Sequence, residues 1–188
     1  MREILVTASV LVLTAFMFNG CINQPPSQPG TNQTGTITEL KPAVAVPVEC
    51  HTTPIYLGHN TAIAGLEEVP WLNAEPPSSG IIAYLFFAGP EASRNQAYQP
   101  LHTGGRYLDG RSTKILWLID SPNASNTIEI TGKKVSASHE TFRQSFPVAS
   151  SPAGNYPSIV NVPTSGCWQL QLKSGTITGT VTFWVVAD

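Results

Sequence analysis

Trp168-Gln169-Leu170-Gln171-Leu172-Lys173 and, beyond a glycine at position 175, Thr180-Val181-Thr182-Phe183-Trp184-Val185 carry the clearest pattern in the chain. Apolar and polar residues alternate in both segments, as they do in a strand with one buried face. Gly175 suits a tight turn between them. The two segments therefore predict an antiparallel hairpin whose apolar face lies in the core.

Two further segments are apolar on both faces and predict strands at the centre of a sheet. They are Ile81–Phe87 and Lys114–Ile119. Shorter strand candidates, lying between turn-forming residues, are Ile55–Leu57, Ala62–Leu66, Trp71–Leu72, Thr127–Thr131 and Pro157–Val162.

Composition also favours strands over helices. Gly (15) and Pro (16) are plentiful, and charged residues make up 12 % of the 188 residues, whereas amphipathic helices need more Glu, Lys and Ala. We expect an all-β fold, an immunoglobulin-like antiparallel β-sandwich with short turns. Gly89–Gly105 is polar and irregular, and predicts one long exposed loop. A closed barrel is the alternative architecture.

The amino terminus predicts an export signal. Ile4–Phe18 is largely apolar, but it is shorter than the run of about 20 residues that a bilayer core requires. It ends at Gly20-Cys21, and a small residue before a cysteine resembles the cleavage site of a bacterial lipoprotein. We expect an acylated Cys21 to hold the chain on the cell membrane, facing the extracytoplasmic side, because two or more acyl chains give stable attachment. An ordinary signal peptide and an uncleaved anchor are the alternatives.

This assignment divides the chain into three parts. Residues 1–20 form the predicted signal peptide. Residues 21–46, which are rich in Pro, Gln and Thr and poor in charge, predict a disordered tether. Residues 47–188 form the predicted sandwich. A first strand or its lead-in is expected at Ala43–Val48.

The chain has 3 cysteines. With Cys21 acylated, Cys50 and Cys167 remain, and an even remainder in an oxidising compartment favours a disulfide. The bridge would close a loop of more than about 100 residues, for which chain entropy gives roughly 4–5 kcal/mol as an upper figure. Two buried free thiols are the alternative.

The carboxy-terminal half carries a motif that runs from Pro157-Ser158 through Pro163 to Gly166-Cys167-Trp168. This motif resembles the ending of a family of uncharacterised bacterial secreted proteins and lipoproteins. Ser79–Phe86 and Lys114–Trp117 are also similar to that family, and the resemblance spans about 53–183. It implies an exported sandwich and no assigned activity, so it transfers no catalytic residues.

Motifs for phosphate binding and nucleophilic catalysis are weak. Gly105–Ser112 has the spacing of a phosphate-binding loop, but a strand rather than a helix follows it, so a hairpin turn is expected. Neither Gly-x-Ser-x-Gly nor Ser-x-x-Lys occurs. Ser138-His139-Glu140 are adjacent, and adjacent strand residues point to opposite faces, so they predict no catalytic relay. Glu67 and Glu68 are also adjacent, so the same geometry argues against their acting together as a catalytic pair of carboxylates.

No metal, cofactor or nucleic-acid site is predicted. The four histidines, His51, His59, His102 and His139, are scattered, whereas a metal site needs three or four convergent ligands. The net charge of -2 gives no field that would attract nucleic acid.

Aromatic and polar residues in the expected loops are the best candidates for ligand binding, because rings beside Arg and Asn hold sugars and peptides. Tyr56, Trp71 and Tyr156 lie in or near such loops. The alternative is that most of the loop aromatics pack against the sandwich. The candidate ligand-binding residues are Arg94, Tyr98, His102 and Tyr107. We expect a non-catalytic binding or structural module of the cell envelope that contacts the lipid bilayer and a cell-wall glycan or envelope protein. An envelope hydrolase and a histidine-based metal-binding lipoprotein are the alternatives.

Overall fold

Strands dominate the computed structural model, which describes residues 36–60, 62–89, 92–137, 139–150, 152 and 154–187. These residues belong to one compact unit, Thr34–Asp188. Its strands are β1 (Thr38–Pro42), β2 (Ile55–Leu57), β3 (Trp71–Asn73), β4 (Ile81–Leu85), β5 (Ala97–Tyr98), β6 (Leu101–His102), β7 (Lys114–Ile119), β8 (Thr127–Lys134), β9 (Thr141–Pro147), β10 (Asn155–Ile159), β11 (Gly166–Ser174) and β12 (Ile177–Val186). Short helical turns are η1 (Pro77–Ser79), η2 (Phe86–Ala88) and α1 (Ala92–Asn95).

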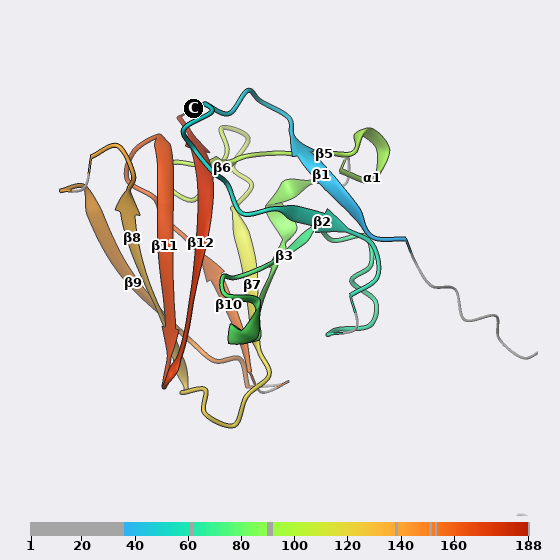
Figure 1. The fold of residues 1–188 in the computed structure, drawn as a ribbon, viewed down its shortest axis with the longest axis vertical. Coiled ribbons are helices and arrows are strands. Elements are labelled where there is room, and N and C mark those ends of the chain that lie inside the picture. Colours follow the sequence, from blue (N-terminus) through green and yellow to red (C-terminus); the bar gives the residue numbers. More distant parts are fainter. Residues whose placement is uncertain are drawn as a thin grey trace, which may run out of the picture. The chain divides into compact units, whose positions relative to one another are not determined.

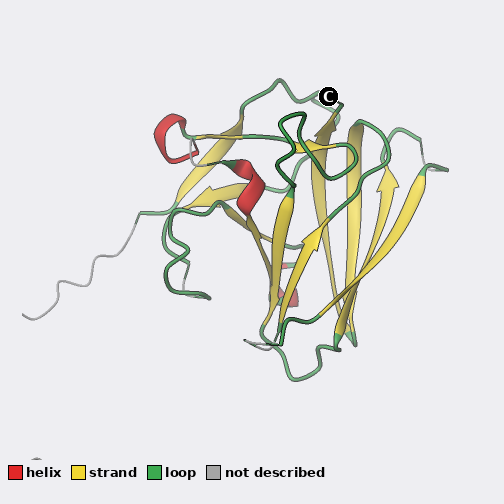
Figure 2. Ribbon diagram, turned by 180° about the vertical axis from the view of Figure 1, so that it is seen from behind, coloured by secondary structure: helices red, strands yellow, loops and turns green. Residues whose placement is uncertain are grey.

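The strands form two sheets that pack face to face (Figures 1 and 2). The first sheet has the order β10-β7-β4-β3-β2-β1-β5 and the second the order β6-β12-β11-β8-β9. Neighbouring strands are antiparallel except for two short parallel pairs, β1 with β5 and β12 with β6. The predicted all-β sandwich is therefore confirmed, with these two parallel pairs as an addition.

Seven strands reproduce the strand order of an immunoglobulin domain. In the first sheet, β4, β7 and β10 take the places of strands A, B and E. In the second sheet, β8, β9, β11 and β12 take the places of C, C′, F and G. The remaining strands of the first sheet, β3, β2, β1 and β5, extend it beyond the position of strand A.

The core lies between the sheets and follows the alternation of the sequence. Trp168 pairs with Phe183 and Leu170 with Val181 across β11 and β12, and all four are buried. Trp117 faces them from β7 and is fully buried, with its indole N–H donating to Ser158 Oγ at 2.9 Å. The predicted hairpin and the central strands at β4 and β7 are confirmed.

Three segments differ from their predictions. Residues 62–66 form turns rather than a strand. Gly89–Gly105 is not one exposed loop, because it contains α1, β5 and β6 and buries Ala92, Tyr98 and Leu101. Strand β1 lies inside the predicted tether, where it pairs with β2 and β5, so the folded unit starts earlier than residue 47.

A disulfide joins Cys50 to Cys167, with 5.6 Å between their Cα atoms, as predicted. It holds the segment before β2 against the start of β11. Nearby, Thr53 N–H donates to Thr182 O at 2.9 Å, and Thr182 N–H donates to Thr53 Oγ1 at 2.8 Å. Glu75 bridges to Thr180, and β6 pairs with the end of β12. The outer edge of β12 is thus covered, which blocks edge-to-edge association there.

Cys21, the predicted signal peptide and most of the predicted tether lie outside the described residues. Within the described part of the chain, no helix reaches the length and apolar character of a membrane-crossing helix.

Candidate binding site at the loop end of the sandwich

The four predicted ligand-binding residues take different environments. Arg94 is exposed on α1. Tyr98 and Tyr107 are 7 % and 9 % exposed. The structure brings His102 and Tyr107 together, with ring centroids 4.2 Å apart.

Tyr107 anchors its loop to the core. Its hydroxyl lies 3.1 Å from Phe87 O and 3.0 Å from Pro100 O, and burial raises its pKa. The Arg111 guanidinium lies over the ring, 4.9 Å from its centroid, and pairs with Asp109. Hydrogen bonds from the Arg111 backbone and side chain lower the pKa of Asp109.

Most of the aromatic residues expected in or near loops pack against the sandwich, as the alternative interpretation holds. Trp71, Tyr98 and Tyr156 belong to strands β3, β5 and β10, Tyr107 lies in a loop that folds back onto the core, and all four are buried. The hairpin expected at Gly105–Ser112 is present, with Arg106 bridged to Ser112. None of these four rings offers an open face to a sugar or peptide.

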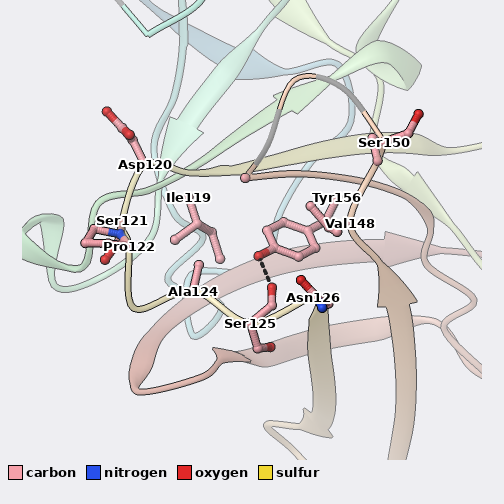
Figure 3. A pocket seen from close by; sticks show the side chains of 12 residues that line it. Ile119, Asp120, Ser121, Pro122, Ala124, Ser125, Asn126, Val148, Ser150 and Tyr156 are labelled. Atoms are coloured by element: carbon pink, nitrogen blue, oxygen red, sulfur yellow. Dashed lines mark hydrogen bonds between the residues drawn. The ribbon is translucent and has the colours of Figure 1, made fainter.

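A hollow of about 620 Å³ lies instead at the end of the sandwich where β7 leads into β8 and β9 into β10 (Figure 3). We call it the loop-end cavity. Ile119 at the end of β7 and Tyr156 in β10 line it. The lining residues from the two connections are Asp120, Ser121, Pro122, Ala124, Ser125, Asn126, Val148, Ala149, Ser150 and Gly154. The volume falls in the range of small-molecule sites.

Backbone and hydroxyl groups fix the base of the loop-end cavity. The Tyr156 hydroxyl donates to Ser125 O, as Figure 3 shows, and lies 3.1 Å from Ser174 Oγ. Ser125 N–H donates to Ser174 Oγ at 3.0 Å. Gly175 in the β11–β12 turn adopts φ +60°, and a Cβ there would lie 2.2 Å from Asn123 O. Only glycine permits this close approach of the two loops.

A second hollow of about 550 Å³ lies on the outer face of the first sheet. We call it the sheet-face cavity. Ile82, Leu118 and Asn155 form its floor as direct cross-strand neighbours on β4, β7 and β10. Residues above and around this floor complete the described lining: Ala62, Ile63, Gly80, Asp120 and Pro152.

Asp120 lines both cavities. It is exposed, and in Figure 3 its carboxylate points away from Tyr156 and Ser125. Among the described lining residues it is the single charged group, and hydroxyl and amide groups supply the other polar contacts. The arrangement suits a ligand that donates hydrogen bonds.

The described lining of both cavities lacks two common catalytic arrangements. It contains no histidine beside a serine, as in Ser-His acyl-transfer enzymes, and no second carboxylate beside Asp120, as in most glycoside hydrolases. In the part of the chain that the structure describes, no group of three or more His, Cys, Asp or Glu residues converges on a metal position.

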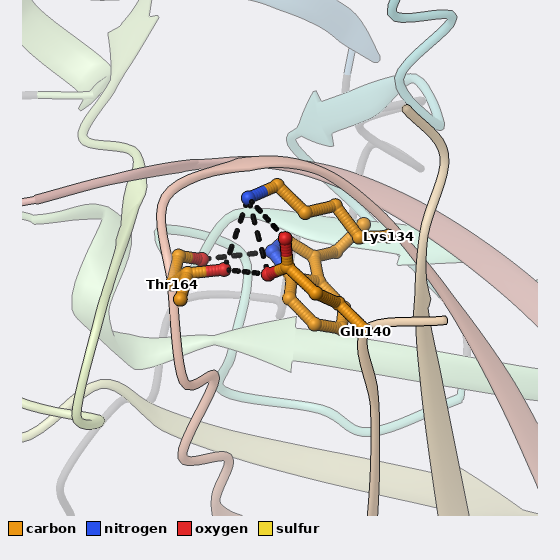
Figure 4. A network of polar contacts seen from close by, with 4 residues as sticks. Lys134, Glu140 and Thr164 are labelled. Atoms are coloured by element: carbon orange, nitrogen blue, oxygen red, sulfur yellow. Dashed lines mark hydrogen bonds and ion pairs between the residues drawn. The ribbon is translucent and has the colours of Figure 1, made fainter. Parts of the chain in front are cut away.

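A separate polar network lies at the opposite end of the strands (Figure 4). Lys134 Nζ lies 3.2 Å from Glu140 Oε2 and 3.1 Å from Thr164 Oγ1, and Thr164 donates to Glu140 at 2.6 Å. Trp168 Nε1 donates to Thr164 O at 2.8 Å. The network ties the β8–β9 turn to the β10–β11 connection, so it positions loops around the buried Trp168.

Sequence reasoning missed Asp120 and Asn155 as site residues. Ser121-Pro122-Asn123 signals a turn, and Asp120 follows a buried strand directly, but this pattern is common at strand ends. Comparisons with protein families, curated proteins and solved structures found no match to this chain. The resemblance of the Pro157–Trp168 motif to secreted bacterial proteins therefore stays a prediction.

Proposed function

We propose that this chain is an exported lipoprotein, held on the extracytoplasmic side of the cell membrane by an acylated Cys21, that binds a component of the cell envelope without transforming it. The folded unit is the binding module, and its ligand contacts the end of the sandwich around Asp120. The partner is a cell-wall glycan or an envelope protein.

The observation that carries this proposal is the pair of cavities that meet at Asp120. The sheet-face cavity lies on the outer face of the first sheet, and the loop-end cavity lies at the end of the sandwich formed by the β7–β8, β9–β10 and β11–β12 connections. These correspond to the B–C, C′–E and F–G loops, and antibody variable domains use the B–C and F–G loops for recognition. This correspondence is an analogy of fold. Loops on a rigid scaffold are suited to recognition because the sheets fix their ends.

The disulfide supports the extracytoplasmic part of the proposal. Cys50 and Cys167 are joined, and such bonds persist in oxidising compartments and are rare in the cytosol. The described lining residues favour binding over the hydrolase and metal-binding alternatives, because they provide neither a nucleophile with its base nor a convergent ligand set.

Retention of envelope material tests the proposal. The full chain, purified in detergent, is immobilised and exposed to solubilised envelope from the cells that make it. Ser150→Arg places a long charged side chain at the exposed rim of the loop-end cavity, and the matched control Ser145→Arg makes the same change on the exposed side of β9.

We expect the wild type and Ser145→Arg to retain the same glycan or protein and Ser150→Arg to lose it. Equal retention by all three proteins would place the contact elsewhere. Hydrolysis of an ester or glycoside panel that Ser150→Arg abolishes would replace the binding proposal with the hydrolase.

A further inference from the structure

Residues 43–52, which we call the strap, lie between β1 and β2 and pass over the end of the second sheet where β12 ends (Figure 1). Residues 43–48 are all alanine, valine or proline, and Val48 is 90 % exposed. Within the strap, all of which the structure describes, Cys50 is the single buried residue. The strap is therefore an apolar surface segment that adds almost nothing to the core.

Few backbone hydrogen bonds hold the strap to the sheets. At its start, Ala43 N–H donates to Tyr98 O at 2.9 Å. The other described backbone hydrogen bonds between residues of the strap and the rest of the chain are absent, and those that are present join strap residues to one another. The disulfide from Cys50 to Cys167 is therefore the main described attachment of residues 44–51 to the second sheet.

The strap forms one wall of a third cavity, of about 380 Å³. Trp184 also lines this cavity, on the outer face of β12, since its neighbours Phe183 and Val185 face the core. The described lining consists of Pro47, Glu49 and Cys50 from the strap, with Val135, Ser136, Gly166, Cys167 and Trp184 from the second sheet and the turn after β8. Release of the strap would remove one wall and uncover Trp184.

The bridge decides whether the strap stays in place. Ordering a chain segment costs conformational entropy at every residue, and burial of one small side chain, that of Cys50, offsets little of this cost. The covalent bond confines the strap without further contacts. The sandwich, by contrast, is held by core side chains such as Trp117, Trp168 and Phe183, whose packing does not involve the strap.

We infer that the Cys50–Cys167 disulfide is a reducible clasp: a dithiol that reduces it frees the strap and uncovers Trp184, while the sandwich keeps its fold. One thiolate of the dithiol attacks a sulfur of the bridge, forms a mixed disulfide and releases the other cysteine as a thiolate. The second thiol of the dithiol then displaces the remaining cysteine. The dithiol becomes a disulfide, two electrons pass to the bridge, and Cys50 and Cys167 each end with a proton. An oxidising compartment keeps the clasp closed. This inference is independent of the ligand proposed for the loop end.

Reduction of the folded full chain in detergent tests the inference, with dithiothreitol as the dithiol. The chain is reduced without denaturant, the new thiols are blocked with iodoacetamide, and the reagents are removed. Elastase, whose pocket accepts small side chains, reports on the strap because residues 43–48 are alanine, valine or proline. Acrylamide quenching of tryptophan fluorescence reports on Trp184, because Trp71, Trp117 and Trp168 are at most 6 % exposed.

We expect reduction to speed elastase cleavage within residues 43–48 by about tenfold, because cleavage follows the population of the open segment. Quenching of Trp184 should increase, and thermal unfolding should remain a single cooperative transition. Cys50→Ser/Cys167→Ser should behave like the reduced wild type before any dithiothreitol is added. Trp184→Phe should keep the change in cleavage and lose the change in quenching.

Three results would overturn the inference. The first is a bridge that resists dithiothreitol in the folded chain. The second is a rate of cleavage and an extent of quenching that stay unchanged after complete reduction. The third is loss of the cooperative melting transition on reduction, because the bridge would then hold the whole sandwich rather than the strap.

Discussion

Gly132 on β8 leaves no room for a side chain, because a Cβ there would lie 2.0 Å from the ring of Phe142. That ring in turn packs on Trp168, with centroids 5.4 Å apart. We expect Gly132→Ala to lower the free energy of unfolding by about 1–3 kcal/mol, as overpacking does. Urea denaturation measures the change.

Two variants control for this prediction. Thr131→Val, on the exposed side of the same strand, should stay within about 0.5 kcal/mol of the wild type. Phe142→Leu replaces the contacting ring with a smaller aliphatic side chain and should recover part of the loss when combined with Gly132→Ala. A Gly132→Ala protein as stable as the wild type would refute this packing.

The Cys50–Cys167 bridge joins residues 117 apart in sequence. We expect Cys50→Ser/Cys167→Ser to lower the free energy of unfolding by about 2–5 kcal/mol. A reductant should lower the urea midpoint of the wild type and leave that of the double variant unchanged. If the urea midpoint of the wild type did not change when a reductant had access to the Cys50–Cys167 bond, this would contradict a stabilising disulfide.

Individual residues were predictable to different degrees. The pairing of Cys50 with Cys167 followed from counting thiols, and burial of Trp168 followed from its alternation with Gln169. Burial of Tyr98 and Tyr107 did not, because both lie in stretches of sequence without a repeating apolar pattern. Their burial depends on where distant strands place the loop, and neighbouring residues do not encode that.

Strands with strong alternation were predicted well, and strands defined by their partners were missed. Buried and more exposed residues alternate along most of β11 and β12. In β9, Phe142 and Phe146 flank Gln144, whose side chain bonds the backbone of Asn161 at 2.8 and 3.1 Å. In β1, the sequence TELKP has a single buried residue, Leu40. Pairing, rather than hydrophobic pattern, makes these two segments strands.

The connection between β8 and β9 predicts a pH dependence. Hydrogen bonds from Thr164 and Lys134 hold the pKa of Glu140 below its ordinary value of 4.5. The unfolded chain binds this proton more readily than the folded chain. The resulting stabilisation is present above pH 4.5 and is lost as the pH falls through the lowered pKa of the folded state.

We therefore expect Glu140→Gln and Thr164→Val to flatten the acid side of the curve of melting temperature against pH. Thr164→Val removes the hydroxyl donor, and the backbone carbonyl that accepts from Trp168 remains. Melting temperatures measured from about pH 7 down to about pH 2 cover the transition of an acidic group. A wild-type slope in both variants would show that the network does not lower the pKa of Glu140.

The candidate site emerges at the scale of the whole molecule. Asp120, Asn155, Ile82 and Ile63 come from separate parts of the chain, and strand order brings them to one cavity. The sequence predicted the sandwich and placed a turn after β7, but it could not show which loops enclose a hollow. The connection between β2 and β3 supplies Ala62 and Ile63 to the sheet-face cavity, and both of these strands are only three residues long.

We predict that the exported chain is attached to the membrane through its acylated Cys21. Mass spectrometry of the membrane fraction should find an amino terminus at Cys21 carrying a diacylglyceryl group. Cys21→Ala should leave the folded unit unchanged and release it from the membrane, because the acyl chains supply the anchoring free energy. A chain that keeps Met1, or one that starts at another residue, would contradict the lipoprotein assignment.

Site-specific photo-crosslinking in the cells that make the protein tests most directly whether the loop end is the binding surface. A photoreactive amino acid replaces Ser150 at the rim of the loop-end cavity or, as the control, Ser145 on β9. We predict one dominant envelope adduct from position 150 and none from position 145. Equal adducts at both positions, or an adduct from position 145 alone, would contradict ligand binding at the loop end.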